Sequence, residues 1–414
     1  MEWSTACEWF VVARTGIIYP AMAALKLMLS EFRWNDRYRI SGAEDALTPA
    51  LVLYPDIVAS NIACTVRLLG GDATRWRAHI KTAKIGYTLR MLVERGVRNF
   101  KCATTLELKT ACENGAEDVL VAYPVMGANA RRVREIADQF PHVRISALAE
   151  NKEQVRQWQG SRAGVFLDIN PGMNRTGLEA KDGEELLALV REINAAKLEF
   201  RGLHYYDGQF GGMEEAERTA AAHAGYDRLM ELVAELRRRG TRIPEVITAG
   251  TPTLPSSLSY ERFRNGEFIH RVSPGTVVYC DATCLAQLSP DYGYAPAVIV
   301  MAQVVSHPHD DIITCDGGHK AVSADAGVPT CVVMGYPGLE PLSPSEEHLP
   351  IRTAGAVRTP GVGETIMLIP RHVCPTVNNF DSAVLVRDGR IEAVEKVSAR
   401  GHEELLPRVP TTSK

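Results

Sequence analysis

The sequence has no CxxC pair, no block of basic residues and no uninterrupted apolar run long enough to cross a membrane. Its nine cysteines are spread singly along the 414 residues, which argues against a disulfide framework and for a reducing compartment. Lysine and arginine number 46 against 50 acidic residues, and without a basic cluster a nucleic-acid partner is not expected. We therefore expect a soluble, cytoplasmic protein that binds neither nucleic acid nor a membrane.

The N-terminal stretch is apolar, but it lacks the features of a signal peptide. Arg14, Pro20 and Lys26 interrupt it, and acidic residues stand where a basic start would be. We interpret residues 1–45 as a packed helical extension. A helix that lies on a membrane surface or binds a partner is the alternative.

Hydrophobic residues make up 45% of the chain, enough for two domains or for one large barrel with a smaller satellite domain. From about residue 76, short apolar runs alternate with amphipathic stretches. Eight such units predict a parallel sheet closed into a (β/α)8 barrel, with an open doubly wound sheet as the alternative. The eight expected strands are Arg77–Lys81, Asn99–Ala103, Asp118–Ala122, Val143–Ala147, Gly164–Asn170, Phe200–Tyr206, Glu245–Ala249 and Glu267–His270.

Between these runs lie residues that typically begin or end a helix. Thr104 and Glu107 form a capping-box pattern ahead of a helix that Gly115 ends. A longer helical pattern runs from residue 213 to residue 239 and is closed by Gly240.

After about residue 290 the pattern changes to short β-rich runs broken by Gly, Pro and Asp, which predicts an antiparallel β domain. An early strand, Leu51–Tyr54, is expected to join that sheet. The domain prediction is a helical extension over 1–45, a joining strand over 46–60, the barrel over 61–285 and the β domain over 286–414.

In barrels the chemistry lies where the strands end. The first strand ends with His79 and Lys81 on one face, and a lysine in that position can form a Schiff base. The fifth strand leads into a Gly-rich turn with Arg175, and the sixth ends at Tyr206. A solvated lysine at a strand end remains the alternative for Lys81 alone.

Two small turns follow the last two strands. "TAGTPT" contains Gly250 and Thr251, and "SPGT" contains Gly275 and Thr276. Small residues and hydroxyls let backbone N–H groups approach a phosphate, and many barrels bind one there. A lysine, an arginine and two phosphate-binding turns on one rim suit pyridoxal phosphate.

Near the C-terminus, "IPRHVCPTVNNF" places His372 and Cys374 two residues apart. If the run from Thr365 to Cys374 is an extended strand, both side chains face one space. Imidazole and thiolate suit zinc or a similar metal, but a structural zinc normally takes four ligands. A pair of ordinary buried residues is the alternative.

Several short motifs occur together in an order that is specific to one enzyme family. They are "TPALVL", "RAHIKT", "MNRTGL", "AGTPT", "SPGT", "DGGHKAVSADAG", "SEEH" and "IPRHVCPTVN". Through them the chain resembles the fold-type III pyridoxal-phosphate enzymes, which have an alanine racemase-like N-terminal barrel. Within these it resembles the metal-dependent D-serine dehydratases and D-threonine aldolases, over about residues 45 to 403.

The resemblance implies roles for individual residues. Lys81 would carry the cofactor, and His79 and Tyr206 would lie beside it. Arg175 would contact the ring's phenolic oxygen. The phosphate would be held by Gly250, Thr251, Gly275 and Thr276. His372 and Cys374 would bind a divalent metal, with zinc expected from the thiolate.

The resemblance also implies a homodimer and a lyase that acts on a β-hydroxy-D-amino acid. We expect dehydration of D-serine or D-threo-3-hydroxyaspartate to a 2-oxo acid and ammonia, because in this family the HxC pair accompanies dehydration. Retro-aldol cleavage to glycine and an aldehyde is the alternative. A racemase or a non-catalytic cofactor-binding protein is a further alternative for the function. Ala83 departs from the family pattern, which has a second histidine there.

Overall fold

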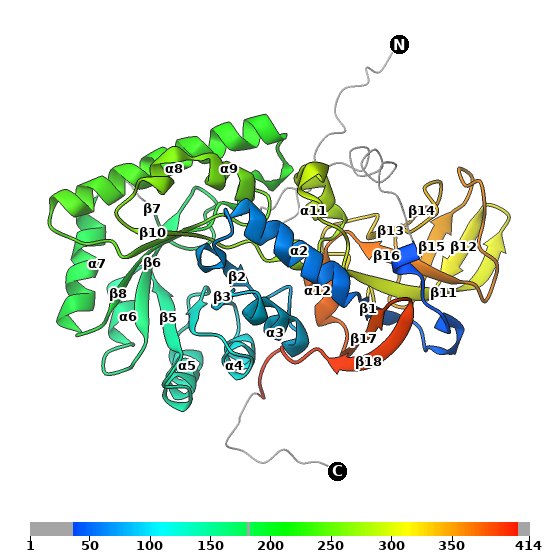
Figure 1. Cartoon of the computed structure of the whole chain (residues 1–414), viewed down its shortest axis with the longest axis horizontal. Helices are drawn as coiled ribbons and strands as arrows, with labels where there is room; N and C mark the ends of the chain where they lie inside the picture. The colour runs from blue at the N-terminus through cyan, green and yellow to red at the C-terminus, as the bar shows by residue number, and fades with distance from the viewer. Residues whose placement is uncertain (1–35, 180–182, 405–414) are drawn as a thin grey trace.

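The computed structural model describes residues 36–179 and 183–404. Most of the expected N-terminal extension therefore lies outside the described residues, and what is described of it begins with two short 3-10 helices, Asp36–Tyr38 and Ala43–Asp45. Figure 1 shows two halves side by side, a barrel ringed by helices and a smaller domain made mostly of strands.

Eight parallel strands form the barrel, as the sequence predicts. Their spatial order is β10-β9-β8-β6-β5-β4-β3-β2, and a parallel bridge between Trp76 and Val272 joins the two ends. This closure rules out the open doubly wound sheet. The strands are β2 (Arg77–His79), β3 (Asn99–Cys102), β4 (Asp118–Val121), β5 (Arg144–Ala149), β6 (Gly164–Asn170), β8 (Phe200–Tyr205), β9 (Glu245–Thr248) and β10 (Ile269–Val272).

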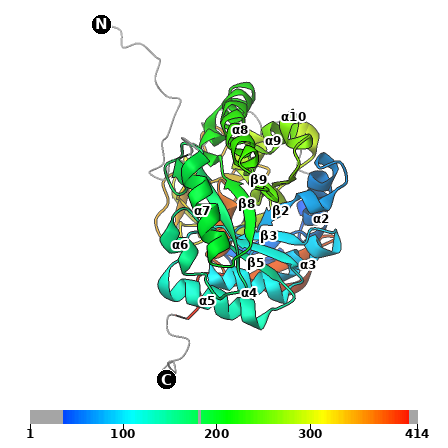
Figure 2. The same cartoon turned by 90° about the vertical axis from the view of Figure 1, so that its left-hand side faces the viewer.

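Helices surround the barrel, as the end-on view in Figure 2 shows. The predicted capping residue begins α4, because Thr104 Oγ1 accepts the Glu107 N–H at 3.1 Å. The long predicted helix is α8. The helices of this half are α2 (Pro55–Leu68), α3 (Gly86–Glu94), α4 (Thr105–Glu113), α5 (Gly127–Gln139), α6 (Lys152–Arg156), α7 (Gly183–Ala195), α8 (Glu215–Arg238), α9 (Leu254–Ser259) and α10 (Glu261–Arg264).

A buried ionic network fills the barrel at the amino ends of its strands. Arg77 Nη1 lies 2.7 Å from Asp118 Oδ1, and Arg77 Nε lies 2.9 Å from Glu245 Oε1. Arg201 and Arg271 contact the same two carboxylates. Burial alone would raise the pKa of Asp118, but the charges of Arg77 and Arg201 hold it well below its usual range. This end of the barrel is thus filled with paired charges.

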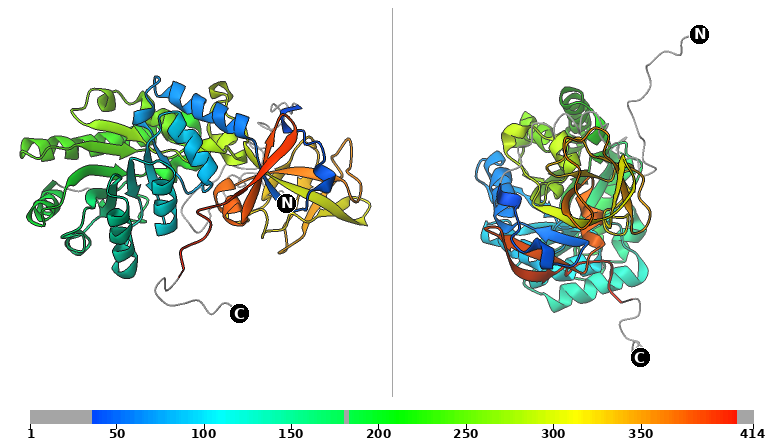
Figure 3. Two further views of the ribbon diagram at one scale, coloured as in Figure 1. Left: turned by 60° about the horizontal axis from the view of Figure 1, so that its bottom comes forward. Right: turned by 90° about the vertical axis from the view of Figure 1, so that its right-hand side faces the viewer.

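The second half is a β domain, which Figure 3 shows from two further sides. Its strands are β1 (Ala50–Leu53), β11 (Val298–His309), β12 (Ile312–Cys315), β13 (Cys331–Val333), β14 (Glu340–Pro341), β15 (Leu349–Arg352), β16 (Thr365–Pro370), β17 (Ser382–Arg387) and β18 (Arg390–Lys396). They follow the order β14-β15-β12-β11-β1-β17-β18, and β16 pairs with both β11 and β13.

The sheet differs from the prediction in one pairing. The early strand β1 is antiparallel to β11 but parallel to β17. Because β1 and β17 come from distant parts of the chain, no short hairpin connection requires them to run in opposite directions. The domain is therefore antiparallel except at this pair.

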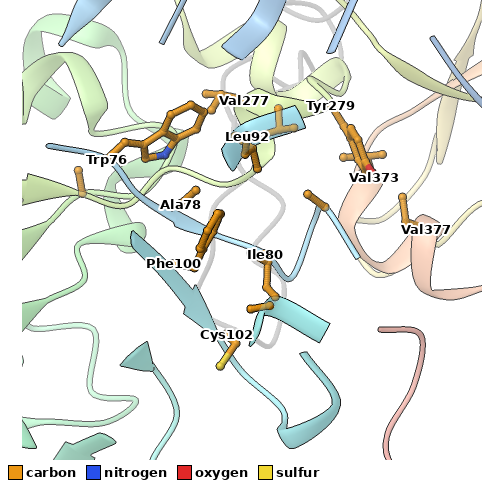
Figure 4. Packing of buried hydrophobic residues seen from close by; sticks show 14 of the residues in the cluster. Trp76, Ala78, Ile80, Leu92, Phe100, Cys102, Val277, Tyr279, Val373 and Val377 are labelled. Carbon is orange, nitrogen blue, oxygen red and sulfur yellow. The ribbon is translucent and has the colours of Figure 1, made fainter. Parts of the chain in front are cut away.

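A continuous apolar core joins the two halves. Figure 4 shows buried side chains running from Trp76 and Phe100 in the barrel to Val373 and Val377 in α12 (Val373–Asn378), a short helix of the β domain. These four residues belong to one buried cluster. The core thus holds α12 against the barrel, next to the carboxyl end of β2.

The eight described cysteines are all buried and free. Within the described part of the chain, no helix combines the length and the apolar character that crossing a membrane requires.

Candidate active site

One cavity lies at the carboxyl ends of the barrel strands, facing α12. It brings together nine of the ten residues singled out from the sequence, although they come from five separate segments. These residues are His79, Lys81, Tyr206, Gly250, Thr251, Gly275, Thr276, His372 and Cys374. The tenth, Arg175, lines an adjoining hollow that shares Tyr206 with the cavity.

Lys81 lies in a turn and not on a strand. β2 ends at His79, two residues earlier than predicted, and His79 Nδ1 accepts the Lys81 backbone N–H at 3.3 Å. Burial, followed by the neighbouring charge of Lys81, keeps the pKa of His79 well below its usual value. His79 is therefore a neutral imidazole beside the Lys81 amine.

Three cationic side chains surround the ring of Tyr206, just beyond the end of β8. Distances to the ring centroid are 4.9 Å from Arg175 Cζ, 5.6 Å from Lys101 Nζ and 5.9 Å from Lys81 Nζ. Cations within about 6 Å of an aromatic face are attracted to it. Basic side chains thus gather around Tyr206, which lines the cavity, and this surrounding suits an anionic ligand.

The two Gly-Thr turns approach their neighbours too closely for any larger residue. A Cβ on Gly250 would lie 2.9 Å from Tyr206 Cε2, and one on Gly275 would lie 2.4 Å from the His79 carbonyl oxygen. Thr251 Oγ1 is buried and has no hydrogen-bond partner among the described residues. A buried hydroxyl of this kind normally has a partner, so the turns fit the phosphate of pyridoxal phosphate.

The segment with His372 and Cys374 is not the extended strand that was predicted. β16 ends at Pro370, His372 caps α12, and Cys374 lies in its first turn. Pro375 does not prevent this helix, because N–H groups in a first turn have no partner within the helix. Both side chains nevertheless line the cavity.

Three hydrogen bonds hold this segment in place, two with Asp281 and Thr283 and one from Thr376 within the segment itself. The Val373 N–H donates to Asp281 Oδ2 at 2.9 Å. Asp281 itself caps α11 (Ala282–Gln287), and its buried carboxyl has a raised pKa. Thr283 Oγ1 donates to the Arg371 carbonyl at 2.7 Å, and Thr376 Oγ1 donates to the His372 carbonyl at 2.8 Å. These hydrogen bonds to the backbone therefore fix the orientation of the two candidate ligand side chains.

The electrostatics of the pair suit metal binding. His372 Nδ1 lies 2.7 Å from Asp325 Oδ2, a contact that assigns Nε2 as the ring atom that would bind a metal in exchange for its proton. Burial lowers the pKa of His372, but Cys374 and Asp325 outweigh it and raise that pKa to about 10. Burial raises the pKa of the Cys374 thiol, but His372 and Lys81 bring it below its usual value. The Cys374 thiol is thus easier to deprotonate than an ordinary cysteine.

The described residues hold no group of three or more His, Cys, Asp and Glu side chains that could bind a metal. Two protein ligands are too few for a structural zinc site. They suit an open site whose remaining positions go to water or substrate.

Sequence reasoning missed several residues that support the site. Asp325 lies inside the quoted motif "DGGHKAVSADAG" and Thr82 inside "RAHIKT", so both could have been proposed as supporting residues. No sequence signal pointed to Asp281, nor to Lys101, which lies on β3 with its amine beneath Tyr206.

Comparison with known proteins yields two family models. The alanine racemase N-terminal domain matches residues 55–283, and a putative serine dehydratase domain matches residues 297–386. The boundary between the two matches falls where α11 gives way to the β-rich half.

Relatives of both expected reaction types match most of the chain. A D-threonine aldolase from an Arthrobacter species is 25% identical over 370 residues, which cover 86% of this chain and 93% of the relative. A D-threo-3-hydroxyaspartate dehydratase from Delftia sp. strain HT23 is 23% identical over 376 residues, or 84% and 97% of the two chains. The crystal structure of a D-threonine aldolase from Filomicrobium marinum is 26% identical and superposes with a TM-score of 0.79, covering 86% and 96%.

Proposed function

Because the chain belongs to the alanine racemase N-terminal domain family and continues into a putative serine dehydratase domain, we propose that it is a metal-dependent pyridoxal-phosphate lyase acting on a β-hydroxy-D-amino acid. Its reaction in this proposal is dehydration of D-serine or D-threo-3-hydroxyaspartate to a 2-oxo acid and ammonia. One observation carries the proposal: Lys81 lines the same cavity as His372 and Cys374.

The cavity offers a place for each part of the cofactor. The turns at Gly250–Thr251 and Gly275–Thr276 would hold the phosphate, and Thr251 supplies a hydroxyl that lacks a partner in the described structure. Tyr206 would lie beside the ring, and Arg175 would contact its phenolic oxygen. Lys81 would be the residue that carries the cofactor.

His372 and Cys374 would hold a divalent metal, for which the imidazole–thiolate pair favours zinc. When bound, pyridoxal phosphate draws electrons from the substrate Cα, and the metal polarises the β-hydroxyl so that it can leave. Lys81 lines the same cavity, and its amine would take the Cα proton. The neutral His79 adds no second positive charge beside the Lys81 amine.

Retro-aldol cleavage is the second candidate, because D-threonine aldolases align with the chain at 25% and 26% identity. The same residues serve that reaction if the metal stabilises the β-oxygen while the Cα–Cβ bond breaks. Cys374 favours dehydration, since the HxC pair accompanies dehydration in this family. A racemase has no use for a metal pair in its cavity, so His372 and Cys374 argue against that class.

Product identification tests the proposal. The purified protein, supplied with pyridoxal phosphate and zinc, is incubated with D-serine, D-threonine and D-threo-3-hydroxyaspartate, and products are read by mass spectrometry. A 2-oxo acid and ammonia are expected from D-serine or D-threo-3-hydroxyaspartate. Glycine and an aldehyde would establish the aldolase in its place. Full activity after chelation, with no metal bound, would contradict both metal-dependent reactions.

A further inference from the structure

A row of three hydrogen-bonded, buried polar residues crosses the barrel beneath the cavity. Lys101 on β3 lies with Nζ 2.9 Å from His204 Nε2 on β8, and His204 Nδ1 lies 2.7 Å from Asp168 Oδ1 on β6. All three residues are at most 3% exposed. The roles proposed above for the cofactor and metal residues do not use them.

Each end of this row of residues is hydrogen-bonded to a segment that shapes the cavity. Lys101 Nζ donates to Ser273 Oγ at 2.9 Å, and Ser273 Oγ donates to the Ala249 carbonyl at 2.8 Å, just before Gly250. At the other end, Thr176 Oγ1 donates to Asp168 Oδ2 at 2.8 Å, directly after Arg175. The two phosphate turns and the arginine loop thus converge on one buried array.

From this geometry we infer that Lys101, His204 and Asp168 form a positioning array for the anionic cofactor, in which Lys101 supplies a positive charge behind Tyr206. The inference rests on the proposed function and deepens it. A protonated Lys101 has donors for both His204 and Ser273, and the Nδ1–H of neutral His204 then donates a hydrogen bond to the Asp168 carboxylate. In this state two of the three ammonium N–H groups of Lys101 and both ring nitrogens of His204 have hydrogen-bond partners.

The environment of Lys101 makes its charge sensitive to pH. Burial, followed by the charge of Lys81, lowers the pKa of Lys101 to about 7, while Asp168 acts in the opposite direction. Burial also lowers the pKa of His204 to about 4, so His204 stays neutral when Lys101 titrates. Among the described residues, the charged or titratable groups that face Lys101 are Arg77, His79, Lys81, Asp168, Arg175, His204 and Tyr206.

The sign of the effect follows from linkage. An anion bound nearby favours the protonated form of Lys101, so its pKa is higher in the complex than in the free protein. The contribution of Lys101 to binding is therefore fully present below about pH 7. It disappears as the pH rises through the higher pKa of the complex.

The test measures binding of pyridoxine 5′-phosphate to the full-length protein freed of cofactor. This probe carries the ring and the phosphate but has no aldehyde, so bond formation with Lys81 does not enter. Calorimetry between pH 6 and pH 9 gives the dissociation constants of wild type and Lys101→Met. We expect about tenfold weaker binding by the variant at pH 6, the loss of one charge-assisted interaction. The ratio of the two dissociation constants should approach one by pH 9. Titration of the probe itself affects both proteins equally and therefore cancels in this ratio.

A second pair of variants gives an independent test. This test still applies if Lys101→Met does not fold. Glutamine can accept from Lys101 and donate to Asp168, so His204→Gln should bind the probe within about threefold of wild type. His204→Leu breaks both contacts and should bind about tenfold more weakly. Equal affinities for the two variants would overturn the inference.

The remaining outcomes separate this inference from the proposed function. If wild type does not bind the probe at any pH, the cofactor assignment itself fails. If wild type binds and Lys101→Met binds equally well throughout, the array is wrong while the proposed function stands. A deficit in Lys101→Met that is the same at every pH would mean a structural role only, and it would overturn the charge argument.

Discussion

Thr82 Oγ1 lies 2.9 Å from Cys374 Sγ, a contact between residues 292 positions apart in the sequence. Thr82 follows Lys81 directly, and Cys374 lies in the first turn of α12. The contact therefore ties the turn with the candidate cofactor lysine to the segment with the candidate metal ligands. A rigid link of this kind keeps two chemical groups in a fixed relation to one substrate.

Lys81→Ala should abolish covalent attachment of pyridoxal phosphate, because no amine is left to bond the aldehyde. The absorption spectrum of the reconstituted protein measures the attachment, and lyase activity should fall about a thousandfold or more. Lys109→Ala, at a half-exposed helix position paired with Glu113, is the matched control and should leave both unchanged. A Lys81→Ala protein with full activity would refute the site assignment.

Cys374→Ala should remove most of the bound zinc, since one of the two protein ligands is lost. Metal content after dialysis, measured by mass spectrometry, gives the answer directly. Cys331→Ala is the control, because Cys331 is buried on β13 and lies outside the cavity lining. Equal zinc retention in the two variants would show that Cys374 is not a ligand.

Asp325→Asn should weaken zinc binding by about tenfold to a hundredfold, because a carboxylate on His372 Nδ1 orients the ring and raises its basicity. Competition with a chelator of known affinity measures this. The exposed Asp381, which pairs with Arg400, supplies the control Asp381→Asn. No change in affinity would mean that the 2.7 Å contact between Asp325 and His372 has no part in holding the metal.

Arg77→Met should lower the free energy of unfolding by about 3 kcal/mol, because it leaves Asp118 and Glu245 buried with one cation fewer. The loss is limited because Arg201 and Arg271 still contact the two carboxylates. Urea unfolding measures it. Arg98→Met removes an exposed ion pair with Glu117 and should cost less than about 1 kcal/mol. Similar losses in both variants would disprove the importance of the buried network.

Stability should decline in acid partly through His270. Burial lowers the pKa of His270 to about 3, whereas an unfolded histidine titrates near 6.5. The unfolded chain therefore binds an extra proton below about pH 6.5, and stability falls by up to about 1.4 kcal/mol per pH unit down to about pH 3. His270→Gln should flatten this slope in urea unfolding at pH 7, 6 and 5, and His309→Gln, at an exposed position, should not. Unchanged slopes in both variants would contradict the linkage.

Much of the fold could be predicted from local patterns. The eight barrel strands lie within two residues of their expected limits, and Thr104 caps its helix as the sequence indicates. These features depend on side-chain periodicity and on capping groups a few residues away. The end of β2 at His79 and the helix at Val373–Asn378 were missed, because short apolar runs fit a strand and a helix equally well.

The sequence by itself determined the barrel, the β-rich second half and the candidate residues that line the cavity, since their order and spacing along the chain carry that information. The tertiary structure alone decided how these residues meet. It brought Cys374 to Thr82 through the core around α12, placed Asp325 on His372, and joined Lys101, His204 and Asp168 across the barrel. Such contacts link residues far apart in the chain, and they arise from packing of the whole core and not from any local pattern.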